Sequence, residues 1–216
     1  MITSARRQTE NVAAAAPRRR GALDQVLINA AMDLFASYGY RGTSLARIAR
    51  AAGVTKGALY WHFNDKEDFF LAVAERVLEE WNKAFAQERP VVTPADFREY
   101  FLRIFDTSAK LNTTNPWVSR LLMIITLESH KIGPRVLRAM RKANARQLEY
   151  LRDLVVRGKA LGVLASDLDV DWAATQLWSA PAGLQLLWYL HGSRFELRKS
   201  FRRLAREYLQ QWSAPK

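Results

Sequence analysis

Side chains that suit nucleic-acid recognition gather near residue 60 of this 216-residue chain. Within eight residues the sequence carries a hydroxyl, an ammonium group, a phenol, an indole and an imidazole, on Thr55, Lys56, Tyr60, Trp61 and His62. No acid interrupts them, and Gly57 among them would let the backbone approach a partner closely. Such groups bind phosphate oxygens and contact base edges in the major groove of DNA. This stretch therefore predicts a DNA-contacting segment.

Catalytic and metal chemistry have no comparable support in the sequence. The chain has no cysteine, which excludes disulfides, cysteine-based zinc sites and cysteine nucleophiles. Its three histidines, His62, His130 and His191, lack metal-ligand spacing, and the sequence has no glycine-rich phosphate loop or nucleophile elbow. We therefore predict that the chain is not an enzyme and has no catalytic residue, no metal site and no cofactor.

The charge of the chain favours an anionic partner. It has 33 Lys and Arg against 21 Asp and Glu, a formal net charge of +12, which suits either nucleic acid or an anionic membrane surface. Half of the excess falls in residues 1–66, with 10 Lys and Arg against 4 Asp and Glu. The densest part, 1–21, is expected to be a flexible basic arm that contacts phosphate or the minor groove. The alternative for this arm is a solvated tail without a partner.

Helix signals dominate the chain, and strand or hairpin signals are absent. Apolar periodicity, capping residues, glycines and prolines predict nine helices, at about 23–38, 45–52, 56–62, 65–87, 94–111, 116–129, 135–161, 170–190 and 195–211. Pro181 lies inside the eighth helix and is expected to kink or break it, either without functional meaning or to shape a pocket. The predicted fold is all-α, with an N-terminal three-helix domain followed by a six-helix C-terminal bundle.

The elements that would position the DNA-contacting segment have helix-turn-helix spacing. The helices at 45–52 and 56–62 are joined by a Gly-Val turn, and Gly53 can take the left-handed backbone conformation that the turn needs. Ile48 and Leu59 can pack together and hold the two helices at a fixed angle. The second helix has few positions to bury, so we expect its other face to bind DNA.

Here the sequence resembles the DNA-binding domain of the TetR family of regulators. The residues that carry the resemblance are Gly-Thr-Ser-Leu-Ala-Arg-Ile-Ala at 42–49, Ala-Gly-Val-Thr-Lys-Gly-Ala-Leu-Tyr-Trp-His-Phe at 52–63, and Lys66-Glu67. The resemblance implies groove and phosphate contacts for matched residues, namely Thr43, Ser44, Thr55, Lys56, Gly57, Tyr60, Trp61, His62 and Lys66. For Trp61 plain packing is the alternative. Arg47 is an additional candidate, as either a phosphate contact or a solvated charge.

The resemblance also implies a second domain that dimerises and binds a small effector. The expected organisation is an arm at 1–21, a DNA-binding domain at 22–70 and a ligand-binding and dimerisation domain at 71–216. Apolar residues of the last two helices are expected to form a four-helix interface between two copies, with Leu184, Trp188, Phe201, Leu204 and Tyr208 as candidates. An ordinary monomeric core is the alternative for these residues.

Bulky residues on the fourth to eighth helices are candidates for an effector pocket. Aromatic rings and methionine suit a flat or variable apolar ligand, and the candidates are Trp81, Phe85, Phe101, Phe105, Trp117, Met123, Gln176 and Trp178. For each of the aromatic residues core packing is the alternative. Few acids lie among the candidates, which disfavours a cationic drug.

The combined prediction is a cytoplasmic, ligand-responsive repressor that binds a palindromic operator in double-stranded DNA as a homodimer. An architectural protein that coats DNA would explain the charge but not a domain rich in tryptophan. A membrane partner is not expected: the longest apolar run, 121–125, is far shorter than the roughly 20 residues of a spanning helix. The basic helix expected at 135–161 has mixed faces and suits a bundle better than a membrane surface.

Overall fold

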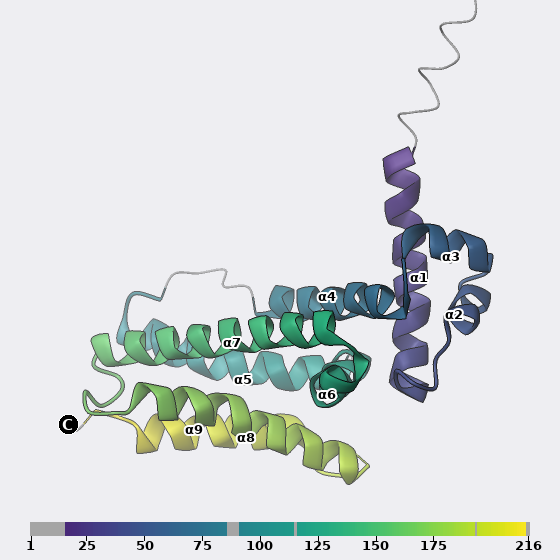
Figure 1. The fold of residues 1–216 in the computed structure, drawn as a ribbon. Coiled ribbons are helices and arrows are strands. Elements are labelled where there is room, and N and C mark those ends of the chain that lie inside the picture. Colours follow the sequence, from purple (N-terminus) through teal and green to yellow (C-terminus); the bar gives the residue numbers. More distant parts are fainter. Residues whose placement is uncertain (1–15, 86–90, 115, 193, 215–216) are drawn as a thin grey trace, which may run out of the picture. The chain divides into compact units, whose positions relative to one another are not determined.

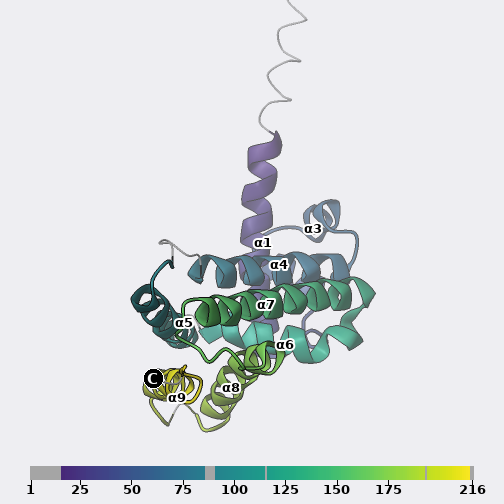
Figure 2. The same ribbon diagram turned by 90° about the vertical axis from the view of Figure 1, so that its left-hand side faces the viewer.

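The computed structural model describes residues 16–85, 91–114, 116–192 and 194–214. Within these ranges the chain forms nine helices: α1 (Ala16–Tyr38), α2 (Leu45–Ala51), α3 (Lys56–His62), α4 (Lys66–Ala84), α5 (Pro94–Thr114), α6 (Pro116–Ile132), α7 (Pro134–Ala160), α8 (Val170–Leu190) and α9 (Leu197–Gln211) (Figures 1 and 2). An isolated bridge between Leu164 and Ser213 is the one β-type pairing recorded there. The predicted all-α class is confirmed. No helix in the described part of the chain is long and apolar enough to span a membrane.

The chain divides into two compact units. The first comprises Met1–Arg76 together with Met123–Leu137, and the second comprises Val77–Leu122 together with Arg138–Lys216. The chain therefore passes from the first unit to the second within α4, a few residues beyond the expected boundary at 70. The sequence did not predict that the end of α6 and the start of α7 would join the N-terminal unit.

Aromatic side chains form the core of the first unit. Phe35 of α1 packs edge-on against Phe70 of α4, with ring centroids 4.7 Å apart, and Phe63 packs in the same way against Phe69 at 4.5 Å. Leu59, the inward residue of α3, is fully buried. The short helices α2 and α3 are thus fixed to α1 and α4 by apolar contacts rather than by their own helical stability.

The core of the second unit lies mainly between α5 and α9. Phe101 and Phe105 of α5 lie in this core with Phe201 and Tyr208 of α9, and the Phe105 ring is 6.4 Å from that of Phe201. At the surface beside them, Asp106 of α5 pairs with arginines of α9. The apolar contacts in the core and the ion pairs at the surface together hold the terminal helix α9 to α5.

Several helix ends differ from the prediction. Helix α1 begins at Ala16, with Pro17 in its first turn, where the missing N–H of proline costs no hydrogen bond. Residues 16–21 of the expected arm are therefore helical, and 1–15 lie outside the described residues. Helix α9 begins at Leu197, not near 195, and its N-cap Glu196 makes no side-chain capping bond.

Pro181 does not break α8, which is continuous from Val170 to Leu190. A proline removes one hydrogen bond to the preceding turn. The helix continues on the backbone bonds at either side, and its buried residues Ala173, Ala174 and Leu177 anchor the part before the proline in the core.

Candidate nucleic-acid interface

Local hydrogen bonds define the two helices of the helix-turn-helix, as the sequence predicts. The Ser44 Oγ accepts a hydrogen bond from the Arg47 N–H at 3.2 Å and caps α2. The Thr55 Oγ1 accepts one from the Ala58 N–H at 3.2 Å and caps α3. Gly53, between the helices, has a φ of +68°, which a residue with a side chain rarely adopts. The turn thus presents the start of α3 at a fixed angle.

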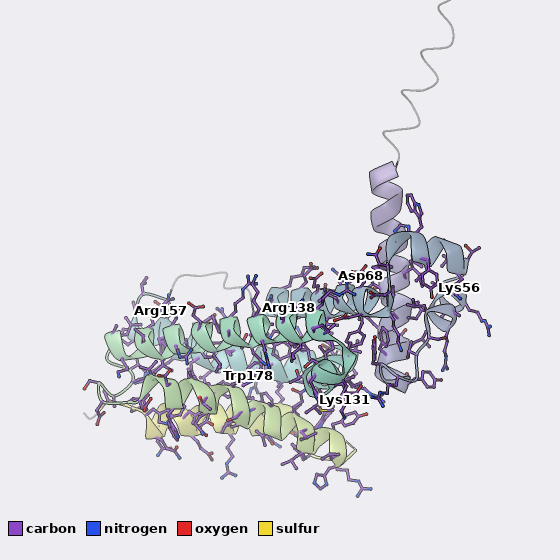
Figure 3. The ribbon with its side chains drawn as sticks, viewed as in Figure 1. Lys56, Asp68, Lys131, Arg138, Arg157 and Trp178 are labelled. Atoms are coloured by element: carbon purple, nitrogen blue, oxygen red, sulfur yellow. The ribbon has the colours of Figure 1, made fainter. Side chains whose placement is uncertain are left out.

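The outer face of α3 carries the predicted polar and aromatic groups. Lys56 is exposed (Figure 3). Gly57 is also exposed, and Tyr60 is 46% exposed. Trp61 is 67% exposed, so packing within this chain does not explain it. His62 is half-buried, and its ring lies 5.5 Å from that of Trp61. This face can offer hydrogen-bond donors and aromatic surface to a partner.

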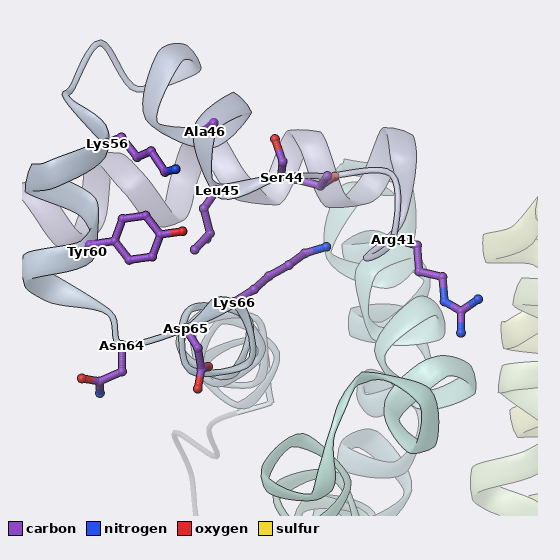
Figure 4. Close-up of a pocket in the computed structure, with 10 residues that line it drawn as sticks. Arg41, Ser44, Leu45, Ala46, Lys56, Tyr60, Asn64, Asp65 and Lys66 are labelled. Carbon is purple, nitrogen blue, oxygen red and sulfur yellow. The ribbon is translucent and has the colours of Figure 1, made fainter.

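An open hollow lies beside this face, between the start of α2, α3 and the start of α4. Its lining includes cationic and polar side chains of all three elements, among them Arg41, Ser44, Lys56, Tyr60, Asn64 and Lys66. Figure 4 shows Lys56 and Tyr60 pointing toward the space beside Leu45, while Lys66 extends toward the segment between α1 and α2 and Arg41 points away from the other side chains. Its cations and hydroxyls can hold a phosphate group.

The ammonium group of Lys66 contacts both the backbone and the ring of Tyr40, which the sequence did not predict. Its Nζ donates a hydrogen bond to the Tyr40 carbonyl at 2.5 Å and lies 4.1 Å from the centroid of the Tyr40 ring. Partial burial lowers the pKa of Lys66 below its ordinary value. An ammonium group has three donors, so two N–H bonds remain for other acceptors at the rim of the hollow.

Arg47 lies on the exposed side of α2, where Tyr38 of α1 supports it. The guanidinium carbon is 3.6 Å from the centroid of the Tyr38 ring, a cation–π contact that limits the freedom of the arginine. Both expectations for Arg47, phosphate contact and solvated charge, are compatible with this position.

Thr43 is the one predicted DNA contact that the structure contradicts. Its side chain is fully buried, and its hydroxyl donates to the backbone carbonyls of Leu34 at 3.1 Å and Gly39 at 2.9 Å. The neighbouring Ser44 caps α2 in its place. Thr43 therefore ties the start of α2 to the end of α1, a role that its hydroxyl could not reveal without the fold.

Arg41 and Asn64 line the hollow, and sequence reasoning missed both of them. Arg41 is an exposed cation in the turn directly before the matched Gly-Thr-Ser segment. A positive charge so close to the motif could have identified Arg41 as a candidate phosphate contact.

The first turn of α4 reaches a distant segment. Asp65 caps this helix, since its Oδ1 accepts from the Asp68 N–H at 2.7 Å. Glu67 instead accepts from the backbone N–H of Arg135 at 2.7 Å and from that of Val136 at 3.4 Å, at the start of α7. The Arg135 guanidinium also pairs with Asp65, Glu67 and Asp68. The pKa of Asp65 is lowered, first by the Asp68 N–H and further by Arg135.

The candidate effector residues do not share one environment. Phe101 and Phe105 are 0% and 3% exposed and belong to the α5–α9 core, as the packing alternative expects. Trp81 and Phe85 are half-buried and pack together with ring centroids 5.0 Å apart. The other candidates are placed as follows: Met123 is half-buried in the first unit, Gln176 is half-buried, Trp178 is 36% exposed on α8, and the Trp117 side chain lies outside the described residues.

Two of the candidate dimer residues are wrongly assigned. Phe201 and Tyr208 are 0% and 7% exposed within a single chain, because α9 turns them toward α5. They cannot contact a second copy without leaving the core. Leu184, Trp188 and Leu204 are half-buried. Exposed apolar side chains of α8 include Leu186, Leu187, Tyr189 and Leu190.

Known proteins resemble this chain in its N-terminal part and also over most of its length. Residues 27–73 match the family model of bacterial regulatory proteins of the tetR family. The chain is 29% identical over 191 residues to the HTH-type transcriptional regulator AcrR of Shigella flexneri, covering 86% of this chain and 85% of that protein. It is 25% identical over 181 residues to a probable acrEF/envCD operon repressor of Escherichia coli, covering 81% and 80%. A TetR transcriptional regulator from Chloroflexus aurantiacus has the same fold, with a TM-score of 0.78, 24% identity and coverage of 90% and 98%.

Proposed function

This chain belongs to the TetR family of regulators, and from that premise we propose that it is a ligand-responsive repressor that binds a palindromic operator as a homodimer. As a helix-turn-helix transcriptional regulator it is not an enzyme. The observation that carries the proposal is the exposed, acid-free face of α3 beside a hollow lined by Lys56 and Lys66. One relative is itself described as a probable operon repressor, which supports repression here.

In this proposal α3 enters the major groove and the hollow holds backbone phosphate. Tyr60, Trp61 and His62 contact the groove and its walls, while Lys56 and Lys66 neutralise phosphate charge. Further contacts come from the helix starts and from α2, through Ser44, Arg47, Thr55 and Gly57. Thr43 has no part, because its hydroxyl is bonded inside the fold.

The dimer would form through the exposed apolar side of α8. Leu187 and Leu190 are 49% and 68% exposed, and a symmetric interface would cover them with the same residues of a second copy. Half-buried Leu184, Trp188 and Leu204 would complete this surface. The outer face of α9 carries Arg198, Lys199, Arg202, Arg203 and Arg206, so it would meet like charge at a two-fold axis. Two subunits would place their α3 helices about 34–36 Å apart, one turn of DNA.

The effector is proposed to be a small, largely apolar molecule bound in the second unit. It would act by binding more tightly to a conformer whose two α3 helices do not fit adjacent grooves. Trp81, Phe85, Gln176 and Trp178 remain candidates for contact with it, because each is only partly buried.

Footprinting and salt dependence test the DNA-binding proposal. The full chain should protect a palindrome in the DNA upstream of its own gene, and even protection of any DNA would point to an architectural protein instead. Lys56→Met should reduce the steepness of the slope of log affinity against log salt by about 1.8, because a homodimer loses two phosphate contacts at about 0.9 each. Lys131→Met, which removes an exposed lysine at the end of α6, is the matched control and should leave the slope unchanged.

Sedimentation of full-length variants tests the dimer. Leu190→Glu should convert the dimer to monomer, because each interface would then bury two carboxylates without partners. Val156→Glu on α7 introduces the same charge at a residue of similar exposure, 52%, and should leave the dimer intact. A dimer that survives Leu190→Glu would exclude this face of α8.

A further inference from the structure

The turn between α1 and α2 carries an arginine to which the matched motif assigns no role. Arg41 stands directly before the Gly-Thr-Ser segment at 42–44, and its side chain is exposed. It also lines the hollow beside α3, together with Lys56 and Tyr60. Whether this cation can serve as a fixed contact for DNA depends on how firmly the structure holds its backbone.

Tyr40, the residue before Arg41, is fixed from the side of α4. Its carbonyl accepts a hydrogen bond from the Lys66 Nζ at 2.5 Å, and its ring packs edge-on against that of Phe70, with centroids 5.0 Å apart. The same carbonyl accepts from the Thr43 N–H at 3.4 Å, which closes the turn. The backbone on the N-terminal side of Arg41 is therefore bound to a second helix at two points.

The residues after Arg41 are fixed from the side of α1. Thr43 is fully buried, and its hydroxyl donates to two backbone carbonyls near the end of α1. Gly42 packs so closely against Tyr38 that an added Cβ would stand 2.3 Å from the Tyr38 carbonyl oxygen. The obstructing atom belongs to the backbone, so it cannot swing away as the end of a side chain can. The backbone of Arg41 is thus held on both sides.

The side chain of Arg41 points to a different place from the other groups of the hollow. Lys56 and Tyr60 point toward the space beside Leu45, whereas Arg41 points away from them (Figure 4). Each strand of DNA carries one phosphate per about 3.4 Å of helix axis, so a protein surface that follows a strand meets several phosphates in succession. The direction of Arg41 suits a phosphate other than the one that Lys56 and Tyr60 can hold.

We propose that Arg41 binds a DNA backbone phosphate next to the one held in the hollow. A guanidinium group can donate two parallel N–H bonds to a phosphate, which fixes direction as well as charge. Because the turn is already held at both ends, binding orders the arginine side chain without a further cost for ordering the backbone. This inference rests on the proposed function, since the phosphate belongs to the DNA that α3 contacts.

The salt dependence of DNA binding by the full chain measures this contact. Arg41→Met should reduce the steepness of the slope of log affinity against log salt by about 1.8, because a homodimer loses two phosphate contacts at about 0.9 each. Between 50 and 200 mM salt the affinity of the unaltered protein should then fall about twelvefold more than that of the variant, which is this slope applied to a fourfold change in salt. Arg41→Lys keeps the charge and should keep the slope.

A second arginine provides the matched control. Arg146→Met removes an exposed arginine of α7 in the second unit and should leave the slope unchanged. An unchanged slope in Arg41→Met would overturn the proposal. An equal reduction in Arg146→Met would also overturn it, because the slope would then report the net charge of the protein and not a contact at Arg41.

Uncharged backbone linkages identify the phosphate. A methylphosphonate would replace one phosphate at a time, at symmetric positions in both halves of the protected sequence. The linkage that Arg41 contacts should weaken binding by the unaltered protein and have little further effect on Arg41→Met, because the two groups act as a pair. For Lys56→Met the corresponding linkage should be a neighbouring one. If no linkage is coupled to Arg41, or if Arg41 and Lys56 are coupled to the same linkage, the proposal is wrong.

Footprinting separates this inference from the function on which it rests. If the full chain protects a palindrome while Arg41→Met keeps the slope of the unaltered protein, the regulator stands and the contact at Arg41 is refuted. If protection is even along any DNA while Arg41→Met reduces the slope, the contact stands and the operator-specific repressor fails.

Discussion

Gly133→Ala should destabilise the protein through a residue 66 positions away in the sequence. Gly133 lies between α6 and α7, and a Cβ built on it would stand 2.2 Å from both the carboxyl carbon and Oε1 of Glu67. Its φ is not in the left-handed region, so space is the constraint. Because the obstructing atoms end a flexible side chain, we expect the Glu67 carboxylate to swing away from Ala at 133 while the backbone stays in place.

The cost follows from the bonds that Glu67 would lose. Its carboxylate accepts from the N–H groups of Arg135 and Val136, and loss of such a helix cap costs about 1 kcal/mol. The ion pair with Arg135 is partly exposed, with side chains 34% and 18% accessible, so it adds at most about 1 kcal/mol. The expected loss is therefore about 1–2 kcal/mol, or a fall of roughly 2–8 °C in Tm for a chain of this size.

A double-mutant cycle identifies the cause. The free energy of unfolding would be measured by urea denaturation for the unaltered protein, Gly133→Ala, Glu67→Ala and the double variant. We expect the double variant to cost no more than Glu67→Ala alone, because Ala at 133 then has no carboxylate to displace. Gly183→Ala is the control: no atom lies within 4 Å of its added Cβ, so it should be neutral or stabilising. Additive costs at 67 and 133 would refute the reasoning.

Three further predictions concern single polar groups. Thr43→Val keeps the side-chain shape but leaves two backbone carbonyls without their hydroxyl donor, so thermal unfolding should show a loss of about 1–3 kcal/mol while the salt slope of DNA binding stays the same. Ser119 and Ser129 are both 5% exposed on α6, but the Ser119 Oγ has no partner and the Ser129 Oγ donates to a backbone carbonyl; calorimetry should therefore find Ser119→Ala neutral or stabilising and Ser129→Ala destabilising by about 1 kcal/mol. Arg202 lowers the pKa of Asp106 in the folded state, so Asp106 stabilises the protein above its unfolded pKa of about 3.9 and loses that effect as pH falls through the folded value. Asp106→Asn should accordingly cost more at pH 7 than below pH 4 in denaturation experiments.

The helix-turn-helix could be predicted from sequence because its determinants are local. Ser44 and Thr55 cap helices through N–H groups three residues away, and Gly53 takes the backbone conformation that the turn needs. The exposed face of α3 follows from the same short-range pattern, since few of its positions are apolar. Thr43 was misread for the opposite reason: its partners are the carbonyls of Leu34 and Gly39, which become neighbours only when α1 and α2 pack.

In the C-terminal helices, the sequence pattern could not predict which apolar residues are buried and which are exposed. Phe101, Phe201 and Leu190 are all large and apolar, and their spacing places each on a helix. Only packing against other helices separates the first two, which are fully buried, from Leu190, which is 68% exposed. Helix α8 is apolar around much of its surface, so periodicity alone cannot say which of its sides meets the core.

By itself the sequence determined the helical class, the positions of most helices and the chemistry of the recognition face, because caps, turns and periodicity act within a few residues. Only the tertiary structure decided that Glu67 caps α7 and that the hydroxyls of Tyr100 and Tyr150 share a hydrogen bond. These contacts join residues about 50 to 70 positions apart. Their geometry depends on how whole helices pack, and no local pattern encodes it.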